Sequence, residues 1–177
     1  GKYADAEPLY RRAIEIGERT FGRDHPTVAT EYNNLALLLQ HLGNDAEAEF
    51  LYRRAIEIDE KSLGKDHPDL ARDYNNLAFL LQNQRKYAEA EPLYRRAIEI
   101  DEKSLGKDLD VARDYNNLAR LLQDQGKYAE AEPHYRRTIE ILESSLGPDH
   151  PNTLSVKTNY DRLLQRLNSQ NSEDASR

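Results

Sequence analysis

Apolar residues recur along this chain at helical spacing, in stripes separated by short polar links. Between Val28 and Leu39 they fall at i, i+4, i+7, i+8 and i+11, which places them on one face of an α-helix. A second stripe runs from Ala48 to Ile56 after a polar link. The pattern predicts an all-α chain built from pairs of amphipathic helices.

The predicted helix pairs repeat along the chain. The stretch YNNLALLLQ begins at Tyr32 and returns in nearly the same form at Tyr74 and at Tyr115, after 42 and then 41 residues. Residues 51–66 are repeated without change at 93–108. A fixed period of this length indicates stacked helix pairs, each in contact with its neighbours.

Turn residues mark the ends of the predicted helices. Gly43 and Gly126 follow the first helix of a pair, where glycine commonly ends a helix, although Arg85 stands there in the middle copy. The link to the next pair reads LG-x-D-H-P at 63–68 and at 146–151. Its proline is expected in the first turn of the next helix, where the missing N–H costs least.

The repeat resembles the tetratricopeptide repeat. Five positions match that family's Leu, small, Ala, aromatic and Ala positions in order: Leu35, Ala36, Ala48, Tyr52 and Ala55. The longer text LGKDHPDLA-x-x-YNNLA-x-LLQ, followed by KYAEAEPLYRRAIEI, is similar to the long repeats of kinesin light chains and their bacterial relatives. This resemblance implies a right-handed superhelical solenoid of helix-turn-helix repeats, in which the first helix of each pair lines a concave groove. Association with a motor is implied by the resemblance alone.

The repeat also sets the expected boundaries. We expect a tetratricopeptide repeat array over 1–168 and a disordered, Ser/Asn-rich tail over 169–177. The array divides into a half repeat, three full repeats and a capping helix, at 1–22, about 26–64, 68–106, 109–147 and 151–168. The half repeat is a second helix without its partner, so its apolar face should be exposed and could pair two copies as a homodimer.

Composition narrows the classes of partner. A net charge of −7 and a pI near 5.3 argue against a general nucleic-acid or anionic-membrane binder. The chain has no cysteine, which excludes disulfides and thiolate chemistry. No apolar run approaches the roughly 20 residues that a bilayer span needs, so a cytoplasmic protein is expected.

The faces opposite the apolar stripes hold the candidate binding residues. By resemblance these faces line the groove, and their residues are Asn33, Asn34, Leu37, Arg72, Asn75, Asn76, Phe79, Arg113, Asn116, Asn117, Arg120, Asn159 and Arg162. An amide can donate and accept, so these asparagines could pair with a peptide backbone or could bond neighbouring helices to one another. Guanidinium groups suit carboxylates, unless they pair with acids on adjacent helices. Kinesin light chains take acidic, tryptophan-containing peptides, so the resemblance implies an acidic peptide partner with one large apolar residue.

Catalytic and metal sites are not predicted. The recurring His25, His67 and His150 belong to different repeats, too far apart to share a metal ion, so helix capping is expected. No nucleophile–base set or phosphate-binding loop stands out from the repeat, which argues against an enzyme and against a cofactor. The favoured function is a peptide-binding adaptor or scaffold, and the alternative is an oligomerisation or spacer array within a larger regulatory protein. One position favours the binder because it differs between copies: Leu37, Phe79, Arg120 and Arg162.

Overall fold

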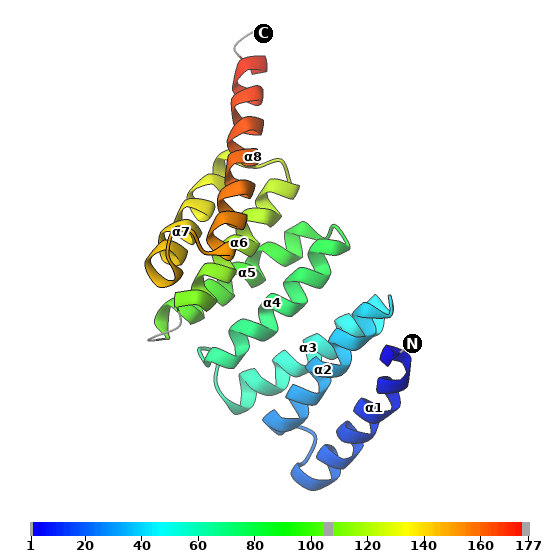
Figure 1. The fold of residues 1–177 in the computed structure, drawn as a ribbon. Coiled ribbons are helices and arrows are strands. Elements are labelled where there is room, and N and C mark those ends of the chain that lie inside the picture. The colour runs from blue at the N-terminus through cyan, green and yellow to red at the C-terminus, as the bar shows by residue number, and fades with distance from the viewer. Residues whose placement is uncertain (1, 105–107, 175–177) are drawn as a thin grey trace. The chain divides into compact units, whose positions relative to one another are not determined.

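The computed structural model describes residues 2–104 and 108–174, and over these ranges the chain is helical apart from short links (Figure 1). The described helices are α1 (Lys2–Phe21), α2 (Pro26–His41), α3 (Asp45–Ser62), α4 (Pro68–Asn83), α5 (Tyr87–Lys103), α6 (Asp108–Asp124), α7 (Tyr128–Leu146) and α8 (Pro151–Asp174). The predicted all-α class is confirmed. The shortened link around 105–107 lies outside the described residues.

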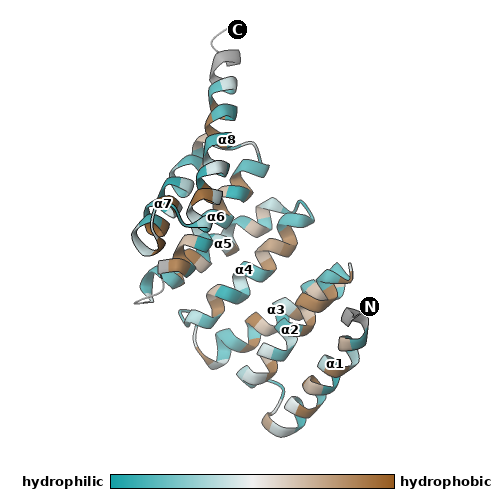
Figure 2. Cartoon of the chain, viewed as in Figure 1, coloured by the Kyte–Doolittle hydropathy of each residue, from teal (hydrophilic) through white to brown (hydrophobic). Residues whose placement is uncertain are grey.

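Contacts divide the chain into two compact units, residues 1–100 and 101–177. In unit one, α2 packs against α1 and α3, and α3 packs in turn against α4. In unit two, α7 lies between α6 and α8 and contacts both. Figure 2 shows apolar and polar positions alternating along the helices, as expected where one face packs inward. Each of these helices therefore packs against a sequence neighbour, as the repeat predicts.

One buried tyrosine per full pair ties the second helix to the first. Tyr52, Tyr94 and Tyr135 are at most 1% exposed. Their hydroxyl groups donate to the glutamine that ends each LLQ stretch, with oxygen–oxygen distances of 3.3, 3.0 and 3.1 Å. A buried tyrosine needs such a partner for its polar end. This bond explains why tyrosine and glutamine recur together in every copy.

The turn between the helices of a pair requires a left-handed residue. Gly43 and Gly126 have φ angles of 79° and 76°, and Arg85 adopts the same conformation with φ at 60°. Around Arg85 the backbone N–H of Lys86 donates to the Leu81 carbonyl at 2.9 Å, as in the glycine copies. The turn is therefore preserved in the middle copy despite the side chain of Arg85.

The linker histidines cap the helices that follow them. The Nδ1 atoms of His25, His67 and His150 accept the backbone N–H two residues further on, at 3.2, 3.3 and 3.2 Å. Such a bond satisfies one of the N–H groups that a helix start leaves without a partner. The expected capping role is confirmed for all three residues.

The last helix is longer than predicted. α8 continues to Asp174, and the Ser169 hydroxyl donates to the Gln165 carbonyl at 2.9 Å. The prediction of disorder from residue 169 is therefore wrong as far as Asp174, and 175–177 lie outside the described residues. No glycine or proline follows Leu167 to end the helix, so its polar end continues from the packed part.

Candidate functional site

The two adjacent asparagines of a repeat differ in burial. Asn33 and Asn75 are each 6% exposed, whereas Asn34 is exposed and Asn76 is half-buried. Successive helix positions point about 100° apart, so the first asparagine turns toward neighbouring backbone while the second stays on the surface. The prediction that Asn33 and Asn75 line the binding surface is therefore wrong.

The buried amides bond within the fold. Asn33 Nδ2 on α2 donates to Asp73 Oδ1 on α4 at 2.8 Å, which joins the first helices of consecutive pairs. Asn75 Nδ2 donates to the Ala71 carbonyl of its own helix at 2.9 Å. The alternative interpretation, in which amides connect neighbouring helices, is thus confirmed for Asn33.

The acceptor of that bond belongs to a buried pair of carboxyl groups. Asp59 on α3 and Asp73 on α4 are 3% and 0% exposed, and each affects the pKa of the other. Burial raises the pKa of Asp73 to about 7, the neighbouring Asp59 adds to the rise, and Arg72 opposes it from 3.6 Å. Burial likewise raises the pKa of Asp59. One proton held between the two groups would satisfy both of them.

In unit two, internal carboxylates compensate the charge of Arg113. Its guanidinium lies 2.7 Å from Asp110, 3.1 Å from Asp114 and 3.6 Å from Asp101. Asp101 and Asp114 occupy the repeat positions of Asp59 and Asp73 and are equally buried. Arg113 therefore pairs with neighbouring acids, which is the alternative that the sequence left open, and it is a weak candidate for selecting acidic partners.

One position of the first helices differs between the copies and is called here the variable position: Leu37, Phe79, Arg120 and Arg162. It lies on the surface in all four copies. Leu37 and Phe79 in unit one are 45% and 43% exposed. Arg120 on α6 and Arg162 on α8 occupy this position in unit two, are exposed, and make no ion pair within the described part of the chain. Unit one thus presents apolar side chains at this position, and unit two presents positive charge. The second asparagines accompany them, from exposed Asn34 to half-buried Asn76, Asn117 and Asn159.

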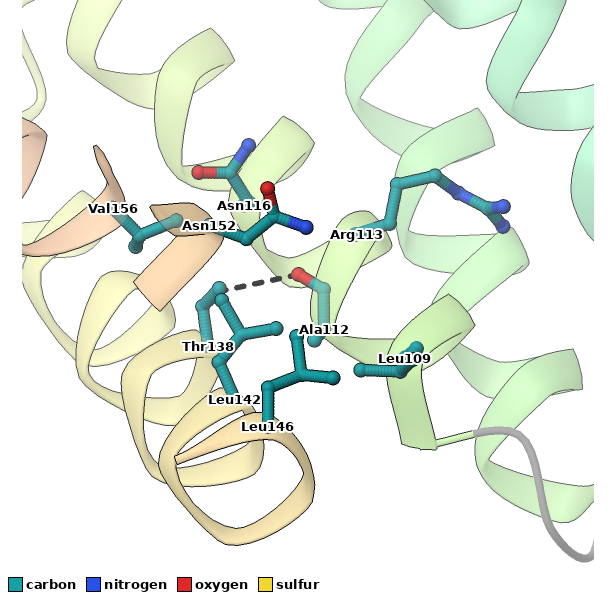
Figure 3. A pocket seen from close by; sticks show the side chains of 9 residues that line it. All are labelled: Leu109, Ala112, Arg113, Asn116, Thr138, Leu142, Leu146, Asn152 and Val156. Atoms are coloured by element: carbon teal, nitrogen blue, oxygen red, sulfur yellow. Dashed lines mark hydrogen bonds between the residues drawn. The ribbon is translucent and has the colours of Figure 1, made fainter. Parts of the chain in front are cut away.

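Unit two also contains a cavity of about 230 Å³ between its three main helices (Figure 3). It is lined by Leu109, Ala112, Arg113, Asn116, Thr138, Leu142, Leu146, Asn152 and Val156. Figure 3 shows the leucines gathered at one end, with the Arg113 side chain extending away from them. The sequence prediction included Arg113 and Asn116 but missed the cavity. The sequence feature that indicates the cavity is the replacement of two aspartates, present in the earlier copies, by Leu142 and Val156.

Comparison with known families decides the identity of the repeat. The model of the tetratricopeptide repeat matches residues 1–61, 28–103, 73–144 and 110–174, which together span the described chain. The chain belongs to the tetratricopeptide repeat family. Its fold is accordingly an all-α repeat solenoid. The tetratricopeptide repeat is a protein-interaction module.

Solved structures agree with this assignment. BtubC (BKLC) from P. vanneervenii is 24% identical, with a TM-score of 0.86 over 99% of this chain and 70% of that one. A Podospora anserina kinesin light chain with nearly identical TPR-like repeats is 25% identical, with a TM-score of 0.83 over 99% of this chain and 83% of that one. The tetratricopeptide repeats of this chain are therefore of the kinesin light chain-like type. No curated protein sequence matches the chain.

Two properties of the described residues bear on the class of site. They contain no cluster of three or more His, Asp or Glu side chains able to hold a metal ion. None of the described helices combines the length and hydropathy needed to cross a bilayer. Among the described residues, the exposed faces of the first helices and the cavity in unit two are features that a ligand could use.

Proposed function

We propose that this tetratricopeptide repeat chain is an adaptor module that binds an extended, acidic segment of a partner protein. In each unit the binding surface is the exposed face of that unit's own first helices, α2 and α4 in unit one and α6 and α8 in unit two. The observation that carries the proposal is the variable position of these helices. At this one position of the first helices, an exposed leucine, an exposed phenylalanine and two exposed arginines stand in successive copies.

The chemistry of the surface supports an extended peptide. Asn34 is exposed and Asn76 is half-buried, and an amide can both donate to and accept from a peptide backbone, whatever the side chains of the peptide. Leu37 and Phe79 offer apolar contact beside them. The likeness to kinesin light chain-like repeats further supports a protein segment as the ligand.

The charges support an acidic partner. The chain carries a net charge of −7, whereas the first helices of unit two expose two arginines, Arg120 and Arg162. Arg120 and Arg162 can form charge-assisted bonds with carboxylates because no described acid occupies them. Arg113 is excluded from this role by Asp101, Asp110 and Asp114.

A titration with fluorescently labelled peptide tests the proposal. The probe is a short Asp/Glu-rich peptide with one tryptophan, and its control carries Asn and Gln in place of the acids. We expect micromolar binding of the acidic probe that weakens as salt rises and that falls in Arg120→Ala with Arg162→Ala. The matched control is Arg53→Ala with Arg136→Ala, which removes two arginines from the second helices and should leave binding unchanged. Binding of neither peptide, or equal loss in both double variants, would contradict the proposal.

A second candidate function, self-association, rests on α1. Leu9 is 70% exposed, whereas Leu51 at the same position of the next repeat is 6% exposed beneath α2. Ile16 and Phe21 on α1 are also exposed, at 51% and 53%. A second copy of the chain could cover this face. Sedimentation equilibrium should then show a dimer that Leu9→Glu dissociates, and a wild-type monomer at high concentration would rule out this role.

A further inference from the structure

Arg72 in unit one and Arg113 in unit two stand in the same local sequence but make different contacts. The stretch ARDYNNLA is identical at 71–78 and at 112–119. Three carboxylates surround the guanidinium of Arg113, at 2.7, 3.1 and 3.6 Å. Arg72 is 51% exposed, and its Nε lies 3.6 Å from Oδ1 of Asp73. The same arginine is thus closely compensated by acids in unit two and only loosely in unit one.

The acids that compensate Arg113 have counterparts in unit one. Asp101, Asp110 and Asp114 stand at the repeat positions of Asp59, Asp69 and Asp73. Asp69 lies beside the link, with its Oδ2 3.6 Å from Nδ1 of His67. The shortened link before α6 reads KDLD and has no histidine, and there Asp110 contacts Arg113. The difference between the two arginines therefore follows a difference between the two links, although the acids themselves are the same.

The buried acids of unit one lie among oxygen atoms that lack donors. Asp59 Oδ1, Asp73 Oδ2 and Asn33 Oδ1 are buried and accept no hydrogen bond from the described residues. Burial raises the pKa of both acids, and the charge of Arg72 opposes the rise. A proton held between the acids avoids two buried negative charges. Once that proton leaves, the pair needs a cation, and unit two shows that an arginine at this position reaches both counterparts.

On its outer side Arg72 belongs to the exposed face of α4. It precedes Asn76 by four residues and Phe79 by seven, a spacing that places the three side chains on one face of the helix. Phe79 is 43% exposed, and Asn76 is half-buried. Arg72 therefore stands between the surface proposed to bind the partner and the buried acids beneath it.

We propose that Arg72 is a proton-controlled contact of the binding surface of unit one. While Asp59 and Asp73 hold a proton, its guanidinium binds a carboxylate of the partner segment. When the proton is lost to solvent, the guanidinium turns inward and pairs with the two acids, as Arg113 does in unit two. This inference rests on the proposed function and adds to it a regulation by pH.

The direction of the pH effect follows from linkage. The partner binds the protonated form better, so affinity rises as pH falls from 8 to 5.5. The carboxylates of the partner keep their charge in this window, because ordinary Asp and Glu side chains titrate at about 4. The other groups that act on the two acids are Tyr52 on α3, His67 in the link and Asp69 on α4, with the neutral Asn33 facing them from α2. Histidine can also respond to pH in this window, so the experiment has to separate its effect.

Three variants make that separation. Asp73→Asn keeps an oxygen acceptor for Asn33 and cannot ionise. Arg72→Ala removes the proposed contact. Arg53→Ala is the matched control, because Arg53 is 48% exposed and pairs with Glu49 and Glu89 on the second helices. Circular dichroism establishes that each variant is folded before binding is measured.

The first measurement is the affinity of the acidic probe at a series of pH values. In the wild type, affinity should fall by about threefold from pH 5.5 to pH 8, the scale of one exposed ion pair. Asp73→Asn should keep the higher affinity throughout, and Arg72→Ala should bind at every pH as weakly as the wild type does at pH 8. Arg53→Ala should follow the wild type. A pH dependence that persists in Asp73→Asn or in Arg72→Ala would overturn the inference.

Urea unfolding without peptide separates this inference from the proposed function. If Arg72 turns inward when the proton is lost, it stabilises the fold more at pH 8 than at pH 5.5. The difference in urea midpoint between the wild type and Arg72→Ala should therefore grow as pH rises. The difference for Arg53→Ala should stay constant, because Glu49 has a lowered pKa and keeps its charge in this window.

The two measurements fail in different ways. A growing difference together with no binding of any probe would refute the adaptor function and support the inward turn of Arg72. A constant difference would overturn the inference whether or not the probe binds.

Discussion

The buried carboxyl pair in unit one should make this protein less stable as pH rises from 5 to 8. Asp59 and Asp73 share one environment on α3 and α4, with Arg72, His67 and Asp69 as the charged or titratable groups that act on them, and with Tyr52 and Asn33 facing Asp73. Because the pKa of Asp73 is raised on folding, the folded chain retains a proton that the unfolded chain releases. The stabilisation is therefore complete below the unfolded pKa and is lost as pH rises through the folded pKa.

The magnitude follows from the two pKa values of Asp73. A rise from the ordinary 3.8 to about 7 corresponds to about 4 kcal/mol of unfolding free energy over the whole range, at roughly 1.4 kcal/mol for each pH unit. The same relation gives a loss of about 3 kcal/mol between pH 5 and pH 8. Glu49, Glu57 and Glu132 have lowered pKa values, so their contribution changes below this window.

Urea unfolding followed by circular dichroism, at a series of pH values between 5 and 8, measures this loss. Asp73→Asn keeps an oxygen acceptor for Asn33 and adds an amide donor toward Asp59. The unfolding free energy of this variant should be nearly independent of pH between 5 and 8, and it should exceed that of the wild type at pH 8. Asp149→Asn, in the exposed link before α8, is the matched control and should follow the wild type. A wild-type free energy that stays flat or rises with pH, or an Asp73→Asn variant with the same slope, would refute the reasoning.

Four further substitutions test the fold. Arg85→Gly should raise the urea midpoint, by about 1 kcal/mol of unfolding free energy, since glycine adopts a positive φ without strain; a loss of stability would show that the side chain matters more than the backbone. Asn33→Ala should cost about 1–3 kcal/mol in the same assay because Asp73 loses its buried donor. Asn34→Ala should change stability by less than about 0.5 kcal/mol, so equal effects would contradict the separation of the pair. His150→Ala should increase hydrogen exchange in the first turn of α8, with a cost of about 1 kcal/mol, and unchanged exchange would exclude the cap.

The sequence was sufficient to predict the helices and their order. The 3.6-residue stripes placed each full pair, supported by the glycine stops and proline starts in the copies that carry them, because these signals are local. The capping histidines were predictable for the same reason. The C-terminal end of α8 was not predicted correctly. Its polar composition was taken as a sign of disorder, although no glycine or proline follows Leu167 to end the helix.

The candidate site was harder to predict because it depends on contacts between copies. In unit one, the first helix α2 packs against the second helix of its own pair, α3, and also against the next first helix, α4. The buried part of its surface is therefore wider than its apolar stripe. Asn33 falls in that additional part, where its amide finds Asp73. A single helix cannot reveal this. The cavity could have been anticipated by comparing copies, since Leu142 and Val156 break a repeated pair of aspartates.

Side-chain amide NMR of the protein with the acidic tryptophan peptide tests the central claim most directly. If the exposed faces of the first helices bind the partner, the signals of Asn34 and Asn76 should shift on addition of peptide, while those of the buried Asn33 and Asn75 should stay. The account would be contradicted if saturating peptide left all of these amides unchanged and shifted signals of the second helices, such as those of Arg53 and Arg136, instead.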